Sequence, residues 1–261
     1  MNIPRTKPYR TLFLLVLVSL ALALGSCASR DRDRTEGWSA ERLYDEAKRA
    51  MGGGNFEQAI DYFEILEARY PFGDFALQAQ LDIAYAYYQF GEYDAAIQAT
   101  ERFMRLHPTH EAVAYAYYLR GLIRYNRGDN ILNNIWPRDM AQMDQERLRR
   151  AFSDFRTVVQ EHPDSDYADD SRQRLVYLRN QMARHELEVA QFYFQRSAYM
   201  AVVNRVDYLI DNYDGAPVMA DGLALQLRAY ERMGLDDRAD EVRRVLAHNW
   251  PDHPDLADGD S

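Results

Sequence analysis

The sequence predicts an all-α fold, a solenoid built from about five helical hairpins stacked one on the next. From residue 40 onward the pattern is helical, and no segment alternates apolar and polar residues between turn signals as a β-hairpin does. A glycine, aromatic, alanine and isoleucine pattern in residues 54–60 returns in residues 91–97, an offset of 37 residues. A repeat of this length is one supersecondary unit, and such units must stack to bury their apolar faces.

The first hairpins carry the clearest signals. Ala59, Phe63 and Leu66 fall on one helical face, where the small alanine lets a neighbouring helix approach closely. Gly54 is expected to end the preceding helix in the left-handed conformation. Pro71 is expected to stop the next helix, because proline disfavours helical geometry in the residue before it.

Later units match this pattern in part, and they divide the predicted body into two domains. Units 1–3 occupy residues 40–163, with the opening helix of unit 3 near residues 111–126 and its closing helix around Phe155. Units 4 and 5 occupy residues 164–251, and unit 4 begins with a long helix. The glycine–aromatic–x–x–alanine pattern, followed by an aromatic residue and a proline twelve residues after the alanine, resembles the tetratricopeptide repeat.

Three segments are expected to lie outside the repeats. Residues 27–39 alternate in charge and read as a flexible tether. Residues 127–146 interrupt unit 3 and include Trp136 and Pro137, so a loop with a short helix is expected there. Residues 252–261 carry four acids and no bases and are expected to form a mobile tail.

The first 26 residues are expected to be a signal peptide. A basic start precedes an apolar run at residues 12–24, which is shorter than the about 20 residues that a membrane-spanning helix needs. Leu-Gly-Ser-Cys at residues 24–27 resembles the bacterial lipobox, which implies that Cys27 is the lipidated mature N-terminus; a chance cysteine is the alternative. Ala28 stands where aspartate would signal inner-membrane retention, so the outer membrane is expected.

Composition and motifs argue against several functions. The chain has 41 acidic and 31 basic residues, so a nucleic-acid partner bound through phosphate neutralisation is not expected. His107 and His110 flank a proline and do not share a helical face, and no metal site is predicted. No glycine-rich phosphate loop, nucleophile elbow or catalytic cysteine is present, so no cofactor and no catalytic residue is predicted. Binding is therefore favoured over catalysis.

Six longer stretches, taken in order with the lipobox, resemble the BamD (ComL) family of outer-membrane lipoproteins. The similarity covers roughly residues 15–250. The stretches are residues 70–73, 78–88, 102–110, 115–122, 175–179 and 201–206.

This resemblance implies a non-catalytic part in the machinery that inserts β-barrel precursors into the outer membrane. It implies a lipid-anchored protein on the periplasmic face that binds the POTRA domains of the barrel-forming BamA subunit, small accessory lipoproteins and unfolded precursors. In the family the C-terminal repeats carry the BamA contact, and the matching phrase implies Arg205, with Asn204 beside it. A guanidinium can pair with a carboxylate in a bidentate fork; an intrachain salt bridge of Arg205 is the alternative.

The N-terminal repeats of the family are implicated in recognising the precursor's C-terminal segment, which is extended and ends in an aromatic residue. Tyrosine offers apolar area with a polar tip, so at least one residue of the tyrosine-rich first helices is expected to face a groove. Packing between helices is the alternative for each. The candidate precursor-binding residues are Tyr70, Phe72, Tyr85 and Tyr88.

Two other functions fit parts of the sequence. A periplasmic repeat lipoprotein that pilots secretins or organises the cell wall would share the lipobox and the repeats, but it would lack the phrase at residues 201–206. A wall-active enzyme would need a convergent polar site, and no such constellation is apparent in the sequence.

Overall fold

The computed structural model describes residues 34–127 and 144–257, which form helices throughout and no strand. The predicted all-α class is therefore confirmed. Consecutive helices pack against one another along the whole series, as stacked hairpins require. The helices are α2 (Ala40–Gly52), α3 (Phe56–Arg69), α4 (Asp74–Phe90), α5 (Tyr93–Leu106), α6 (Val113–Asn126), α7 (Gln145–Glu161), α8 (Ala168–Gln195), α9 (Tyr199–Asn212), α10 (Met219–Met233), α11 (Asp236–Asn249) and α12 (Pro254–Ala257).

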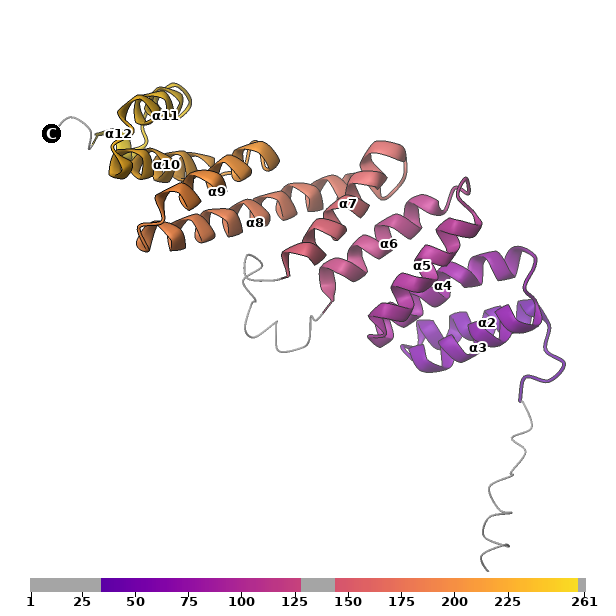
Figure 1. Cartoon of the computed structure of the whole chain (residues 1–261). Helices are drawn as coiled ribbons and strands as arrows, with labels where there is room; N and C mark the ends of the chain where they lie inside the picture. Colours follow the sequence, from indigo (N-terminus) through magenta and orange to yellow (C-terminus); the bar gives the residue numbers. More distant parts are fainter. Residues whose placement is uncertain (1–33, 128–143, 258–261) are drawn as a thin grey trace, which may run out of the picture.

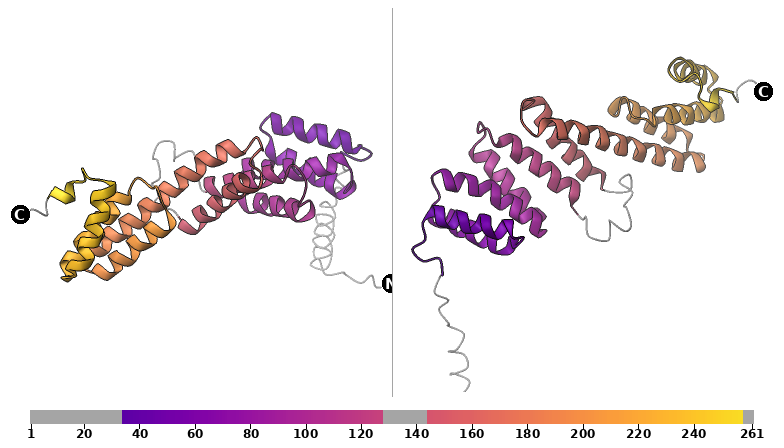
Figure 2. Two further views of the ribbon diagram at one scale, coloured as in Figure 1. Left: turned by 90° about the horizontal axis from the view of Figure 1, so that it is seen from above. Right: turned by 180° about the vertical axis from the view of Figure 1, so that it is seen from behind.

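The hairpins form an elongated array with α2–α5 at one end and α9–α12 at the other (Figure 1). The first helices of neighbouring hairpins also touch, since α2 contacts α4, α4 contacts α6, and α8 contacts α10. The 28-residue α8 runs between the two ends, as both further views show (Figure 2). Leu178 and Met182 pack in a core shared with α7, whereas Leu187 and Ala190 pack in the core of α9 and α10.

The turns follow the sequence signals. Gly54 and Gly91 have φ of 78° and 92°, in the left-handed region that glycine adopts without strain. Helix α3 ends at Arg69. The next residue, Tyr70, directly precedes Pro71 and is no longer helical, with φ −129° and ψ 66°. Gly54 and Pro71 therefore set where α3 begins and where it ends.

Small residues let the helices approach closely. Ala59, Ala96 and Ala151 are fully buried, one in the second helix of each of the first three hairpins. At Gly121 in α6 a Cβ atom would lie 2.8 Å from the ring of Phe155 in α7. That distance is shorter than carbon atoms tolerate, so the contact between α6 and α7 requires glycine at this position.

The described end of the predicted tether is packed, not free. Arg69 Nη2 donates to Thr35 Oγ1 at 2.8 Å, and the Tyr70 hydroxyl donates to the Trp38 carbonyl at 2.7 Å. The body of the protein therefore begins at about residue 35, several residues before the predicted boundary at residue 40. The predicted signal peptide, Cys27 and the rest of the tether lie outside the described residues.

The other two boundaries also shift. Helix α7 begins at Gln145 and is capped by the Asp144 side chain, so its start lies inside the predicted insertion. The start of the predicted mobile tail is packed, since Leu256 lies against the core of α9 and α10, and Arg228 Nε lies 3.3 Å from Asp255 Oδ2. The remainder of the insertion, with the expected short helix, and residues 258–261 lie outside the described residues.

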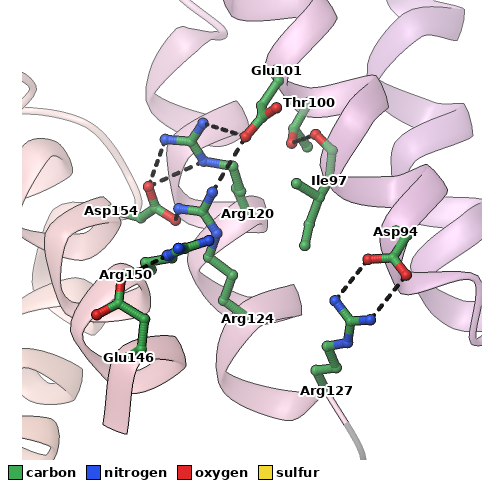
Figure 3. Close-up of polar contacts among 10 residues, drawn as sticks. All are labelled: Asp94, Ile97, Thr100, Glu101, Arg120, Arg124, Arg127, Glu146, Arg150 and Asp154. Atoms are coloured by element: carbon green, nitrogen blue, oxygen red, sulfur yellow. Dashed lines mark hydrogen bonds and ion pairs between the residues drawn. The ribbon is translucent and has the colours of Figure 1, made fainter. Parts of the chain in front are cut away.

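A buried ionic network ties α5, α6 and α7 together (Figure 3). Arg120 Nη2 and Arg124 Nη1 donate to the two oxygens of Asp154 at 2.6 and 2.7 Å, and both arginines reach Glu101 Oε1 at 3.3 Å. Burial raises the pKa of Asp154, although the two arginines act in the opposite direction, and burial lowers the pKa of Arg124. The buried Asp154 carboxylate is therefore stabilised by the two arginines that bond to it.

Replacing Asp154 with asparagine is expected to destabilise the N-terminal half of the array. The Asp154→Asn variant keeps the shape but leaves two poorly exposed guanidinium groups sharing only Glu101. We expect the free energy of unfolding in urea to fall by about 3 kcal/mol. Asp94→Asn is the matched control, since Asp94 also receives a bidentate arginine but its side chain is 70% exposed, and we expect a loss below about 1 kcal/mol. Equal losses in both variants would contradict the role of burial.

Candidate binding surfaces

An open groove of about 410 Å³ lies on the first helices of the N-terminal hairpins. Leu77, Leu81 and Phe103 supply apolar walls, and Tyr44 and Tyr115 stand on neighbouring helices. A cavity of this size with apolar walls and a few polar groups suits a bulky side chain of a bound segment. The complete lining is Tyr44, Lys48, Asp74, Leu77, Gln78, Leu81, Asp82, Phe103, His110, Glu111, Ala112 and Tyr115.

Asp82 organises the polar side of this groove. It accepts from the Tyr44 hydroxyl at 2.7 Å and from Lys48 Nζ at 3.1 Å, so it joins α4 to α2. Burial raises the pKa of Tyr44, and the neighbouring Asp82 raises it further, so the phenol stays protonated and remains a donor. Lys48 is 41% exposed at the groove's edge, where Asp82 balances its charge.

A cluster of tyrosines continues from the groove toward α8. The ring of Tyr167 lies 5.2 Å from that of Tyr115 and 5.1 Å from that of Tyr118, and the Tyr118 hydroxyl donates to Asp170 Oδ2 at 2.8 Å. Tyr115 lines the groove, as expected of at least one tyrosine in the first helices. Tyr118 and Tyr167 serve mainly to pack the helices, because their rings stack between α6 and the start of α8.

The four residues predicted for precursor binding do not gather in one place. Phe72 is 90% exposed in the turn before α4, two residues before Asp74 in the groove wall. Tyr85 and Tyr88 lie edge to face at 6.4 Å between their ring centres and pack against the first core. The Tyr70 hydroxyl donates a hydrogen bond to the Trp38 carbonyl. None of the four lines the groove.

The groove residues that sequence reasoning missed have a recognisable spacing. Leu77 and Leu81 are four residues apart on α4, and Gln78 and Asp82 form the adjoining row. Because this face of α4 mixes apolar and polar residues, it resembles neither a core face nor a solvent face. Such a mixed stripe on the first helix of a repeat is the signal that could have located the groove.

The second surface lies on α9. Arg205 Nη1 donates to Glu186 Oε2 of α8 at 2.9 Å, so the intrachain salt bridge considered as an alternative is present. The Arg205 side chain is nevertheless 38% exposed, whereas that of Glu186 is 4% exposed. Asn204 is exposed, and Met200 and Tyr208, spaced four residues to either side of it, are also exposed. We call Met200, Asn204, Arg205 and Tyr208 the α9 surface.

Within residues 34–127 and 144–257, no three His, Cys, Asp or Glu side chains are grouped as metal ligands would be. Over the same ranges, no helix combines the length and the apolar character that crossing a bilayer demands.

Comparison with known proteins places both surfaces in context. Residues 37–245 match the family described as "YfiO: Outer membrane lipoprotein". A relative from Neisseria meningitidis, named "Outer membrane protein assembly factor BamD", is 40% identical over 93% of each chain. One of the same name from Vibrio cholerae is 35% identical over 92% of this chain and 98% of its own. Among solved structures, the TPR2AB domain of yeast Sti1 is similar with a TM-score of 0.44 and 16% identity, over 83% of this chain and 80% of that one.

Proposed function

Because the chain belongs to the YfiO family of outer membrane lipoproteins, whose relatives are named as assembly factors, we propose that it serves the machinery that inserts β-barrel proteins into the outer membrane. The family match spans residues 37–245, a range that contains the residues of both surfaces. The observation that carries the proposal is this match, together with an elongated array of helices (Figure 1) that has a groove on its N-terminal hairpins and an exposed arginine on α9.

The protein acts here as a docking platform. Helical hairpin arrays recognise partners through extended surfaces, and this chain offers a groove on α2, α4 and α6 and an exposed arginine on α9. A secretin pilot or a cell-wall scaffold is less well supported, since the relatives reported above carry the assembly-factor name.

The α9 surface is assigned to the POTRA domains of the barrel-forming BamA subunit, with Arg205 and Asn204 as contact residues. Support comes from its composition, because arginine, tyrosine and methionine are enriched at the centres of protein interfaces. Arg205 donates through Nη1 to Glu186, and its Nε and Nη2 can donate to a partner. Accessory lipoproteins of the machinery are further partners of the platform.

The groove is assigned to the C-terminal segment of unfolded precursors, which ends in an aromatic residue. Leu77 and Tyr115 would cover such a ring, and Lys48, which also pairs with Asp82, would face its carboxylate. Phe72 is not part of the groove lining, but it is 90% exposed in the turn before α4 and is kept as a candidate contact on the resemblance. Tyr70, Tyr85 and Tyr88 support this surface by packing the helices behind it.

Membrane attachment is assigned to a lipid on Cys27. Several acyl chains hold a protein firmly on a bilayer, whereas a single chain binds only marginally. The platform would then be held at the periplasmic face of the outer membrane, where precursors arrive unfolded.

The first prediction concerns Arg205. Arg205→Lys keeps a positive charge for Glu186 but removes the planar fork, so the dissociation constant for purified POTRA domains should rise about tenfold with little change in melting temperature. Arg205→Ala is a poorer test, because it would also leave Glu186 buried and unpaired. Arg243→Lys on α11, where the arginine is 37% exposed and also paired, is the matched control and should bind normally. Unchanged affinity of Arg205→Lys, measured by calorimetry, would remove Arg205 from the interface.

The second prediction concerns the groove. A peptide that ends in a photoreactive phenylalanine analogue should crosslink to α2, α4 or α6, as mapped by mass spectrometry. Leu77→Ser should weaken that peptide at least about fivefold through lost apolar contact, whereas Leu235→Ser, at an exposed leucine far along the array, should not. Crosslinks confined to residues beyond 160 would refute the assignment.

The third prediction concerns the anchor. Cys27→Ala should abolish incorporation of labelled palmitate and release the protein from the outer-membrane fraction into the periplasm. Ser29→Ala serves as the control and should be lipidated and retained. Retention of Cys27→Ala in the membrane at the level of the unaltered chain would contradict a lipid anchor.

A further inference from the structure

Glu186 is a buried carboxylate in the middle of α8. Its side chain is 4% exposed, and a charge this deep requires a partner of opposite sign. Arg205 of α9 supplies it, at 2.9 Å between Nη1 and Oε2. The pair therefore crosses between two helices, with its acidic end inside the protein and its basic end at the surface.

The guanidinium of Arg205 has two sides with different surroundings. One nitrogen faces Glu186, while Nε and Nη2 make no hydrogen bond within the described residues, and 38% of the side chain is exposed. An arginine fixed by one bond loses less rotamer freedom when a partner arrives than an arginine that moves freely in solvent. The inner bond thus prepares the outer nitrogens for a second carboxylate.

The neighbouring residues indicate what kind of surface this carboxylate belongs to. Met200, Asn204 and Tyr208 recur every fourth residue along α9, so they form one stripe beside Arg205. Asp207 on the same helix is already engaged, since it accepts from Gln226 Nε2 at 2.6 Å. The stripe places two largely apolar side chains and one amide beside a positive charge, which suits a folded protein surface with an acidic side chain beside apolar ones.

The partner is not expected to pull Arg205 away from Glu186. Doing so would leave the buried carboxylate unpaired, which is far more costly than sharing the guanidinium between two acids. Arg205 can serve both because it has five N–H donors arranged in a rigid plane. A lysine, with one nitrogen, cannot span both acids in the same geometry.

We propose that Glu186 is a positioning residue: it holds Arg205 so that the outer face of the guanidinium meets a carboxylate on a folded partner protein docked on the α9 surface. This inference rests on the proposed function, which assigns that surface to the POTRA domains. It adds a buried residue that no partner touches, and it predicts energetic coupling between Glu186 and Arg205 in partner binding.

A double-mutant cycle on the full chain, with purified POTRA domains as the probe, tests this coupling. Glu186→Gln should weaken binding about three- to tenfold, because an uncharged amide holds the guanidinium less firmly. In the Arg205→Lys background the same change should alter affinity by less than about twofold. Glu188→Gln, at a half-exposed acid on α8 that pairs with Arg184, is the control and should leave affinity unchanged in both backgrounds.

A second variant keeps the test open if Glu186→Gln does not fold. Glu186→Asp retains the charge but shortens the side chain by one methylene, so it should draw Arg205 inward and also weaken binding. A purely structural role would change the melting temperature without coupling to Arg205 in affinity, and additive losses would therefore overturn the proposal.

The outcomes separate the two claims. If Arg205→Lys weakens binding and the Glu186 variants do not, the positioning role fails while the proposed interface stands. If Glu186→Gln binds more tightly than the unaltered chain, Glu186 competes with the partner and the proposal is wrong. If Arg205→Lys binds normally, the interface assignment itself fails.

Discussion

Close contact between helices at alanine and glycine positions is the constraint on which the rest of this array depends. Ala59, Ala96 and Ala151 are fully buried, and Gly121 leaves no room for a Cβ atom against Phe155. With helices this close, the larger side chains beside each contact fill the space between hairpins. Every hairpin is then held by its neighbours, and surfaces far apart in the sequence acquire fixed positions.

Helix α8 connects the two surfaces without merging them. It packs with α7 near its first half and with α9 and α10 along its second half, so one continuous helix joins the third hairpin to the C-terminal ones (Figure 1). The groove lies on α2, α4 and α6, whereas the α9 surface lies beside the C-terminal half of α8. Under the proposed function, this separation would leave room for a structural partner and an unfolded segment at the same time.

Local features of the sequence predicted the fold well, because backbone constraints act over a few residues. The glycines at 54 and 91 and the proline at 71 set the hairpin phase, and the structure follows them. Residues 35–39 are packed although the sequence predicts a tether there. Charge alternation depends on composition alone, whereas the bonds of Thr35 to Arg69 depend on tertiary contact.

The role of Glu186 is not visible in the sequence. A carboxylate in a long polar helix is expected to face solvent, and only the fold brings Arg205, 19 residues later, next to it. The groove was missed because its walls come from several helices, and periodicity along one helix does not show how neighbouring helices face each other.

The claim that the protein is a docking platform of the β-barrel assembly machinery is tested most directly by what it binds in its own membrane. The full-length chain, tagged at its C-terminus, would be purified from mildly solubilised outer membranes, and its partners would be quantified by mass spectrometry. The account predicts the barrel-forming BamA subunit at about one copy per copy of this chain. Recovery of a secretin in its place, or of no barrel-forming subunit, would contradict it.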